Sequence, residues 1–233
     1  LSWRAFSRFN EGRNLSPDLA QYEGDEENNT ADYSDGIGKT YTDVWQAWMW
    51  KRHKGMDVVA YKGNGTTGNQ ILHSMNKTPE MIIIKNRTTN SKPWTGGHIG
   101  LNGGTTPWNY YIMFNENSAE GSASTVWNNT APTSTSFTLG NYDGVNGNND
   151  DYLALLFSSV DKISKVGSYT GDGTSTTISL GFQPRFLLIR PTDVTEGWMI
   201  LDTTRGWGSG NDQQLKLDEN SVQSPWNFGE PTS

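Results

Sequence analysis

The sequence predicts an all-β protein made of tandem, jelly-roll-like β-sandwich modules. Ten Trp, nine Tyr and eight Phe side chains offer large apolar areas to bury, although hydrophobic residues make up only 33% of the 233 positions. Disordered chains are poor in such residues, so a folded protein is expected. The apolar runs are short and are separated by Gly-, Asn- and Thr-rich stretches, which is typical of strands joined by turns. The chain also repeats part of its own sequence.

The internal repeat indicates a duplication. Four segments recur in the same order, and the separation between the copies falls slowly from 108 to 103 residues. Such a drift is expected when the loops between matched strands lose a residue or two. The matched pairs are VVAYKGNGT (58–66) with VGSYTGDGT (166–174), TPEMIIIK (78–85) with QPRFLLIR (183–190), Trp94 with Trp198, and NENS (115–118) with DENS (218–221).

A third, partial copy precedes these two. The sequence DVWQAWMW (43–50) resembles DYLALLF (151–157), which aligns Trp50 with Phe157. The chain would then be a piece of a longer array, unless its two ends pair with each other. The expected parts are the C-terminal part of a module over 1–56, a complete β-sandwich module over 57–164 and the N-terminal part of a module over 165–233.

Five strands are expected within the complete module. They share apolar or alternating patterns rich in β-branched and aromatic residues, and they cover 58–61, 81–85, 110–114, 136–139 and 152–157. Turns rich in Gly and Asn separate them. The runs MIII and LALLF do not alternate between apolar and polar residues, which predicts strands that are covered on both faces.

Three other segments are polar or mixed in pattern. Residues 44–53 fit neither the helical nor the strand period, and their match with 152–157 favours a strand. The acidic run 23–27 predicts a solvated loop. The equally polar run 141–151 predicts a long hydrophilic loop at one edge of the complete module.

Composition excludes several classes of function. Without Cys, the chain has no disulfide, no zinc finger, no iron–sulfur cluster and no thiol chemistry. Its 18 basic and 25 acidic groups give a net charge of -7, which argues against binding of nucleic acid. No apolar run approaches the length of a membrane-spanning helix, so no membrane insertion is expected.

Several motifs, taken in order, resemble a known module. The sequences WKRHKGMDVVAYKGNGT, TPEMIIIKNR, WNNTAPTSTSFTLG and SKVGSYTGDGT are similar to a tandem module in predicted virion proteins of marine phages, commonly tail-fibre or other appendage proteins. The resemblance covers residues 43–221. It implies a structural or host-contacting virion protein and assigns no catalytic residue. The chain departs from the pattern at Met56, where other members often carry two aromatic residues.

Glycan hydrolysis would require two facing carboxyl groups, for which Glu116 and Glu219 are the candidates. They hold the same position in two copies of the repeat, within NENS and DENS. A residue that recurs with the scaffold is expected to serve the scaffold. We interpret the motif as an Asx turn, in which Asn115 or Asp218 accepts a hydrogen bond from the backbone N–H two residues on. No catalytic residue is predicted.

The other polar motifs predict no metal site and no cofactor. Gly-x-Gly at 63–65 and 171–173 leads into polar residues and a strand, whereas a phosphate site of this kind needs a helix. The oxygen-rich loop 141–151 offers ligands for Ca²⁺ but lacks the spacing of an EF-hand. The three histidines also lack the spacing of a metal site, and they are His53, His73 and His98.

Tryptophan residues outside the apolar runs are the candidates for ligand binding. Sugar rings stack on flat aromatic surfaces, and amide and hydroxyl groups beside the ring can hold the sugar hydroxyls. The alternative is that these rings fill the ends of a sandwich or the contacts between modules. The four candidates lie among Gly, Thr, Asn and Ser and are Trp108, Trp127, Trp207 and Trp226.

The residues and the resemblance together lead to one expected function and two alternatives. We expect a non-enzymatic protein of the virion surface, a tail fibre or capsid appendage, that contacts host surface glycans. Its partners would be other virion proteins and further copies of itself. The resemblance favours a homotrimer, since fibres of this kind are often symmetric homotrimers, in which weak contacts add through multivalency. The alternatives are a carbohydrate-binding or depolymerising tailspike-type module and a purely architectural capsid cement protein.

Overall fold

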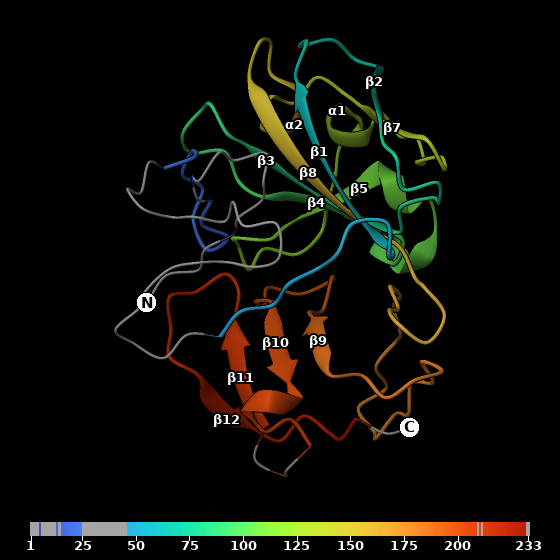
Figure 1. The fold of residues 1–233 in the computed structure, drawn as a ribbon, viewed down its shortest axis with the longest axis vertical. Coiled ribbons are helices and arrows are strands. Elements are labelled where there is room, and N and C mark those ends of the chain that lie inside the picture. Colours follow the sequence, from blue (N-terminus) through green and yellow to red (C-terminus); the bar gives the residue numbers. More distant parts are fainter. Residues whose placement is uncertain are drawn as a thin grey trace.

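The computed structural model describes residues 5, 13, 15–24, 46–208, 210 and 212–231. Within them the protein is all-β, with three antiparallel sheets and helices of a single turn (Figure 1). The strands are β1 (Met56–Lys62), β2 (Asn69–Leu72), β3 (Met81–Asn86), β4 (Thr95–His98), β5 (Tyr110–Met113), β6 (Gly121–Ser122), β7 (Ser136–Leu139), β8 (Asp151–Phe157), β9 (Phe186–Ile189), β10 (Met199–Asp202), β11 (Asp212–Lys216) and β12 (Ser224–Trp226). The short helices are η2 (Leu101–Gly104), η3 (Pro107–Asn109), α1 (Ser124–Trp127), α2 (Asp143–Asn146) and η4 (Thr203–Arg205).

The largest sheet has the strand order β1-β8-β3-β4-β5-β6. Its centre is apolar on both faces, because β3 and β8 carry runs of aliphatic residues without alternation. Ile82 and Ile84 point into one buried cluster, and Ile83 between them points into another. β1 and β8 pair along their whole length, beginning with Met56 opposite Phe157. The start of β1 and the end of β8 therefore lie side by side.

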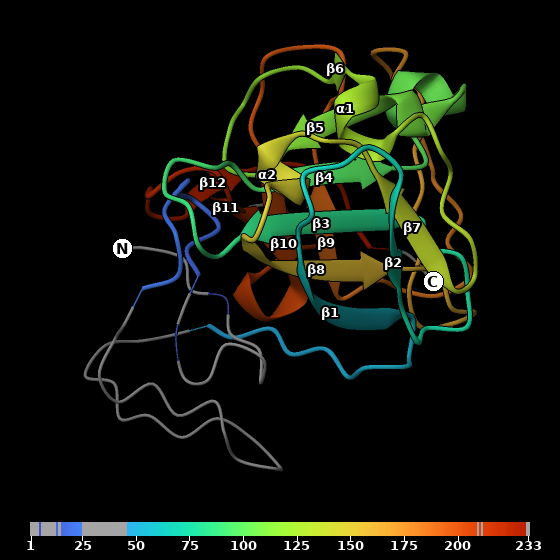
Figure 2. The same ribbon diagram turned by 90° about the horizontal axis from the view of Figure 1, so that it is seen from above.

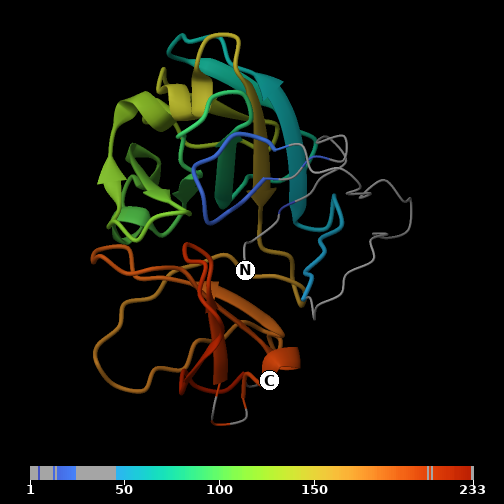
Figure 3. The ribbon, with the colours of Figure 1, turned by 90° about the vertical axis from the view of Figure 1, so that its left-hand side faces the viewer.

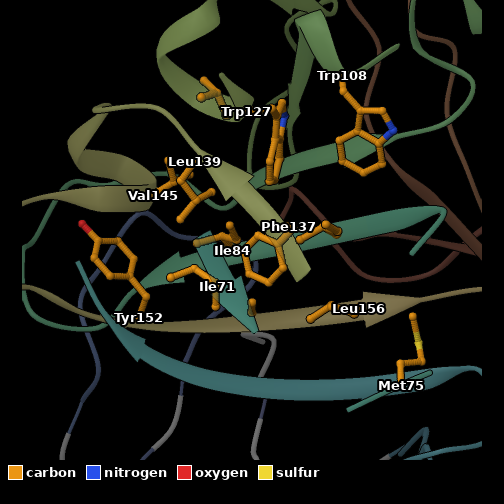
Figure 4. Close-up of a cluster of buried hydrophobic side chains, with 13 residues drawn as sticks. Ile71, Met75, Ile84, Trp108, Trp127, Phe137, Leu139, Val145, Tyr152 and Leu156 are labelled. Atoms are coloured by element: carbon orange, nitrogen blue, oxygen red, sulfur yellow. The ribbon is translucent and has the colours of Figure 1, made fainter. Parts of the chain in front are cut away.

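A two-stranded sheet of β2 and β7 covers one face of the largest sheet (Figure 2). The two layers enclose a main core that is rich in aromatic rings (Figure 4). Gly97 of β4 shows how closely this core is filled, since a Cβ there would lie 2.5 Å from Trp108 and 2.9 Å from Trp127. The buried members of the core are Ile71, Met75, Ile82, Ile84, Trp108, Val126, Trp127, Phe137, Leu139, Val145, Tyr152, Ala154 and Leu156.

Two segments that are distant in sequence cover parts of the opposite face of the largest sheet. Leu15 comes from the N-terminal part of the chain, and Trp198 comes from the C-terminal part. Figure 3 shows the C-terminal strands below the largest sheet in that view. The second buried cluster consists of Leu15, Met56, Val58, Ile83, Trp94, Leu101, Ile112, Phe114, Leu153 and Trp198.

The C-terminal sheet has the order β9-β10-β11-β12 and follows β3-β4-β5-β6 in both strand order and register. Met81 pairs with His98 across β3 and β4, and Phe186 pairs with Asp202 across β9 and β10. Phe186 comes 105 residues after Met81, and Asp202 comes 104 residues after His98. The pairing of β4 with β5 recurs in that of β10 with β11, and the pairing of β5 with β6 recurs in that of β11 with β12. In each case corresponding residues lie opposite each other.

The five strands expected in the complete module are confirmed as β1, β3, β5, β7 and β8. Burial on both faces of the non-alternating runs is confirmed as well, since Ile82 and Ile84 are 0% exposed and Ile83 is 7% exposed. The largest sheet and the β2–β7 sheet together lie within residues 56–157. The expected module boundaries at 57 and 164 stay predictions.

Two expectations about the N-terminal part are wrong where the structure describes it. A strand was expected over residues 44–53, but residues 46–50 form none. Residues 44 and 45 lie outside the described residues. Glu23, at the start of the acidic run expected to be solvated, is buried. Its carboxylate accepts hydrogen bonds from Arg87 at 3.1 and 2.8 Å. This bidentate ion pair compensates the buried charge of Glu23. Residues 25–27 lie outside the described residues.

Candidate interface between the two sheets

Arg190, directly after β9, connects the C-terminal sheet with the end of β5. Its side chain is buried, and its guanidinium donates to the carbonyl oxygen of the adjacent Pro191 at 3.2 Å and to three backbone carbonyl oxygens at the end of β5 and in the loop after it. These belong to Met113 at 3.0 Å, Glu116 at 3.0 Å and Ser118 at 2.6 Å. Charge-assisted hydrogen bonds of this kind are about twice as strong as neutral ones. Arg190 therefore holds the loop after β5 against the end of β9.

Trp198, directly before β10, fills the same junction. Its ring stacks on that of Phe114, with centroids 4.3 Å apart and planes inclined by 10°. Its indole N–H donates to the carbonyl oxygen of Met113 at 3.1 Å. The guanidinium carbon of Arg190 lies 5.4 Å from the centre of the Trp198 ring, within the range of a cation–π interaction. Buried aromatic contacts and hydrogen bonds thus stabilise the same junction.

The charge of Arg190 makes this junction specific. Burial lowers the pKa of Arg190, while the nearby carboxylates of Asp218 and Glu196 raise it. The guanidinium keeps its proton, because Arg is not deprotonated in proteins. A different loop that lacked these three carbonyl acceptors would leave the buried charge with only the carbonyl oxygen of Pro191 and the two nearby carboxylates to compensate it.

Trp94, 104 residues before Trp198, holds the corresponding place on the largest sheet. Its indole N–H donates to the carbonyl oxygen of Ser16 at 2.9 Å, and the neighbouring Leu15 is 1% exposed. A carbonyl oxygen from a separate segment therefore meets the indole in both sheets. In one case the segment is N-terminal, and in the other it is the end of β5.

Lys85 corresponds to Arg190 in the repeat, 105 residues earlier. Its side chain is 0% exposed, and its ammonium donates to the backbone carbonyl oxygen of Lys92. Burial lowers the pKa of Lys85 to about 8. The corresponding strands β3 and β9 thus each lead to a buried cation. The acceptor of Lys85 is local in sequence, whereas three of the acceptors of Arg190 belong to the end of β5 and the loop after it.

The NENS and DENS motifs connect strands across a hairpin. The side-chain oxygen of Asn115 accepts from the backbone N–H of Trp94 at 2.7 Å. That of Asp218 accepts from the backbone N–H of Trp198 at 2.9 Å. The interpretation as an Asx turn is therefore corrected, since these oxygens reach the facing strand and not the backbone two residues on. The motif positions the two tryptophans of the junctions.

Glu116 and Glu219 make local contacts near these hairpins. The carboxylate of Glu219 pairs with Lys216 at 2.9 Å. Glu116 is exposed, and its carboxylate lies 3.5 Å from the hydroxyl of Ser118. The backbone carbonyl oxygen of Glu116 is an acceptor for Arg190, so this position contributes to the junction through its main chain.

The four tryptophans predicted as a glycan surface have different surroundings. Trp108 and Trp127 meet edge to face in the main core, with centroids 5.4 Å apart. The indole N–H of Trp207 donates to the carbonyl oxygen of Gly229 at 2.8 Å. These three rings are 6%, 1% and 8% exposed, so they cannot stack on a sugar from solvent. Trp226, on the edge strand β12, is 55% exposed, so it is the one of these four rings that a sugar can reach from solvent.

The polar run 141–151 is a packed part of the module. Asn146 is 0% exposed, and its side-chain oxygen accepts from the backbone N–H of Asn64 at 3.0 Å and the side-chain amide of Asn69 at 2.8 Å. The carboxylate of Asp150 likewise accepts from two neighbouring side chains. Protein donors thus occupy these oxygens. In the part of the chain that the structure describes, no three His, Asp or Glu side chains are grouped as a metal site requires.

The three histidines lie in separate surroundings. Burial lowers the pKa of His98 to about 4, and its Nδ1 accepts from the backbone N–H of Gly100 at 2.9 Å. Burial also lowers the pKa of His73, whose Nε2 lies 3.3 Å from the carbonyl oxygen of Thr133. His53 is exposed in a turn and has a positive φ of 64°. Each histidine therefore belongs to its own local structure.

Sequence reasoning missed Arg190 as a functional residue. The available signal was the last position of the matched runs MIIIK and FLLIR, where Lys and Arg follow aliphatic residues. A cation at the end of a buried strand must find hydrogen-bond acceptors. The pattern does not say whether these acceptors lie in the same sheet or in another one.

None of the helices among the described residues is long and apolar enough to cross a bilayer. Comparison with known proteins gives one result. Residues 29–230 match the model of a family described as a domain of unknown function (DUF7483). Neither a curated protein nor a solved structure matches the chain.

Proposed function

The chain belongs to this DUF7483 family, and we propose that it is a non-enzymatic structural protein of a phage virion, in a tail fibre or another surface appendage. The similarity of its ordered motifs to modules in virion proteins of marine phages supports this role. The observation that carries the proposal is the junction of Arg190 and Trp198 with the end of β5. An appendage needs stiff connections between successive sheets, and this junction is of that kind.

The chemistry of the junction suits a connection under mechanical force. A stacked aromatic pair resists separation of the sheets, and three carbonyl acceptors hold the guanidinium in one orientation. The corresponding bond from Trp94 to Ser16 ties the N-terminal segment to the largest sheet in a similar way. The net charge of -7 helps to keep crowded copies soluble.

Host contact through glycans is the second part of the proposal, and Trp226 supports it. This ring is 55% exposed on an edge strand whose three residues are all exposed. Asn227 follows it and provides an amide beside the aromatic surface. Sugar binding at such a site is weak, so we propose that it acts through several copies of the chain, with a homotrimer as the favoured assembly.

Imaging of intact virions tests the structural role. A labelled antibody against this chain is expected to decorate the tail or the capsid surface of a phage that encodes it. Label on the capsid alone would favour the cement-protein alternative. Label that stays in the host cytoplasm and never reaches particles would contradict the proposal. Release of reducing ends from a glycan by the purified chain would favour the depolymerising alternative.

Trp226→Ala tests the glycan contact. We expect retention on host-surface glycans to fall at least about tenfold, which corresponds to about 1.4 kcal/mol of lost stacking. The melting temperature should not change, because more than half of the ring is exposed. Glycan-array binding and thermal unfolding measure the two effects.

Val222→Ala is the matched control, since this side chain is 72% exposed near the same strand. It should leave both binding and melting unchanged. Equal glycan binding by the wild type and Trp226→Ala would remove Trp226 from the proposal.

A further inference from the structure

Five basic side chains make no ion pair and no hydrogen bond within the part of the chain that the structure describes. They are Lys51, Lys54, Lys162, Lys165 and Arg185, and all five are exposed. Every other basic side chain described there has a carboxylate or carbonyl partner. The five unpaired cations are therefore available to a ligand.

Four of these cations come from two segments that lie side by side. The segment 51–54 leads into β1, and the segment 162–165 follows β8, whose end pairs with the start of β1. The backbone N–H of Ser158 donates to the carbonyl oxygen of Gly55 at 2.8 Å. A Cβ on Gly55 would lie 2.6 Å from a methyl carbon of Val160, so the chain is in contact directly beside the four lysines.

Arg185 joins these lysines from the C-terminal sheet. It directly precedes Phe186, the first residue of β9. The ring of Trp50 meets that of Phe186 with centroids 5.8 Å apart and that of Phe157, at the end of β8, with centroids 6.3 Å apart. Figure 3 shows the segment before β1 running from the largest sheet towards the C-terminal strands. All five cations line one hollow between the two sheets.

Two exposed aromatic rings line the same hollow. Trp50 is 53% exposed, and Tyr169 is 51% exposed. Trp50 directly precedes Lys51, and Tyr169 comes four residues after Lys165. The hollow thus offers flat apolar faces as well as positive charge.

Positive charge prevails around these cations, although the whole chain carries a net charge of -7. Six basic and two acidic side chains occur in the segments concerned, which are 51–57, 160–166 and 184–186. One of the acids, Asp57, is buried and accepts a hydrogen bond from Arg52 at 2.7 Å, and the other, Asp161, is exposed. Two further exposed carboxylates that line the hollow, Asp193 and Glu230, follow β9 and β12. Charge complementarity therefore favours an anionic ligand at the five cations.

The arrangement suits an extended polyanion that also has apolar faces. A lysine is a point charge on a flexible stem, so separate lysines match single charges that are spaced along a chain. Sugar rings stack on aromatic faces, and a polyuronate carries one carboxylate on each sugar. The choice of a glycan over a single-stranded nucleic acid rests on the proposed contact with host glycans.

We propose that this hollow binds an acidic polysaccharide of the host surface, whose charges are carboxylates. The five cations hold the carboxylates, and the rings of Trp50 and Tyr169 pack against the faces of the sugars. Trp226 also lines the hollow, so the inference adds the charge of the glycan to the proposed host contact.

Binding of polygalacturonate to the purified chain tests the inference, with dextran as the uncharged probe. We expect the affinity for polygalacturonate to fall at least about tenfold between about 50 and about 200 mM salt, because salt screens the charges and its ions compete for them. Dextran should bind at least about tenfold more weakly at the lower salt concentration. Isothermal titration calorimetry measures both affinities.

Lys162→Gln with Lys165→Gln should weaken the binding of polygalacturonate at least about tenfold. The melting temperature should not change, because both side chains are exposed and unpaired among the described residues. The control is Lys62→Gln with Lys92→Gln, which removes the same charge from two lysines that are paired with aspartates and do not line the hollow. It should change the affinity less than about twofold.

Three results would overturn the inference. The first is a wild-type chain that does not bind polygalacturonate, and the second is an equal loss of affinity in the two double variants. The third is tighter binding of a single-stranded DNA with the same number of charges, because the hollow would then be a nucleic-acid site.

The test also separates this inference from the proposed function. Label on virions without binding of polygalacturonate would remove the acidic-glycan site and leave the structural role standing. Binding of polygalacturonate that the double variant Lys162→Gln, Lys165→Gln loses would support the site even if the label never reached particles.

Discussion

At the scale of single residues, buried polar side chains determine how the fold responds to pH. His98 at the end of β4 is mostly buried, and its Nδ1 accepts the backbone N–H of Gly100. Protonation of the ring would remove this acceptor and place a charge in a poorly solvated position. Burial therefore lowers the pKa of His98 to about 4, although the negative charge of Glu80 opposes the shift.

We expect the free energy of unfolding to fall when the pH decreases from 6.5 towards 4. In this range the unfolded state takes up the proton of His98 and the folded state does not, so the stability present above pH 6.5 is lost. The loss from this group is about 1–3 kcal/mol. Urea unfolding at several pH values measures it.

His98→Asn should remove much of this pH dependence, since the amide oxygen of Asn can accept the N–H of Gly100 and does not titrate. His53→Asn is the control, because His53 is exposed and Asn tolerates its positive φ. The explanation fails if His98→Asn and His53→Asn unfold with the same dependence on pH as the wild type.

At the scale of single elements, an Asx side chain organises each hairpin. Asn115 follows β5 and accepts the N–H of Trp94, and Asp218 follows β11 and accepts the N–H of Trp198. In both hairpins the backbone carbonyl oxygen of the tryptophan accepts the N–H of the residue before the Asx, at 2.8 and 3.0 Å. The side-chain bond thus adds one hydrogen bond to the ladder between the two strands. It fixes the backbone position of each tryptophan.

Asn115→Ala and Asp218→Ala should each lower the free energy of unfolding by about 1–2 kcal/mol. The reason is that each change leaves a partly buried tryptophan N–H without its acceptor. Asn117→Ala serves as the control, because Asn117 is exposed in the same motif. Denaturant unfolding measures the three effects, and a cost for Asn117→Ala equal to that for Asn115→Ala would refute the role of the hairpin bond.

At the scale of the whole molecule, a few contacts couple the C-terminal sheet to the rest. Arg190 supplies three of the hydrogen bonds between them, and the Phe114–Trp198 stack supplies the aromatic contact. The two sheets have separate strand ladders. Their cooperation in unfolding therefore depends strongly on this junction.

Arg190→Met should cost about 2–3 kcal/mol, because three carbonyl oxygens lose a charged donor while the apolar stem is kept. We expect the C-terminal sheet to unfold before the largest sheet in this variant. Hydrogen exchange should show protection lost in β9 and β10 while it remains in β3 and β8.

Arg185→Met is the control for this experiment, since Arg185 is an exposed cation just before β9. It should leave the unfolding transition unchanged. A single cooperative transition of undiminished stability in Arg190→Met would show that the junction does not couple the sheets.

Several parts of this architecture are readable from local patterns. The strands β1, β3, β5, β7 and β8 follow from short apolar runs between Gly- and Asn-rich turns, because side-chain period and turn chemistry act over a few residues. The separations between matched motifs reappear as matching strand registers in β3–β6 and β9–β12. A repeated sequence pattern gives matching hairpins because strand period and turn chemistry depend on nearby residues.

Other parts depend on contacts between residues far apart in the chain, and local patterns cannot supply them. Trp127 and Trp226 both lie in polar sequence, yet one is 1% exposed and the other 55%. Their difference arises because Trp127 packs against Trp108 in the main core, whereas Trp226 lies on the edge strand β12. Arg190 likewise meets its acceptors only when the end of β5 is brought beside β9, more than seventy residues away in sequence. Burial and partner choice are properties of the assembled layers, since water is excluded only once the layers have met.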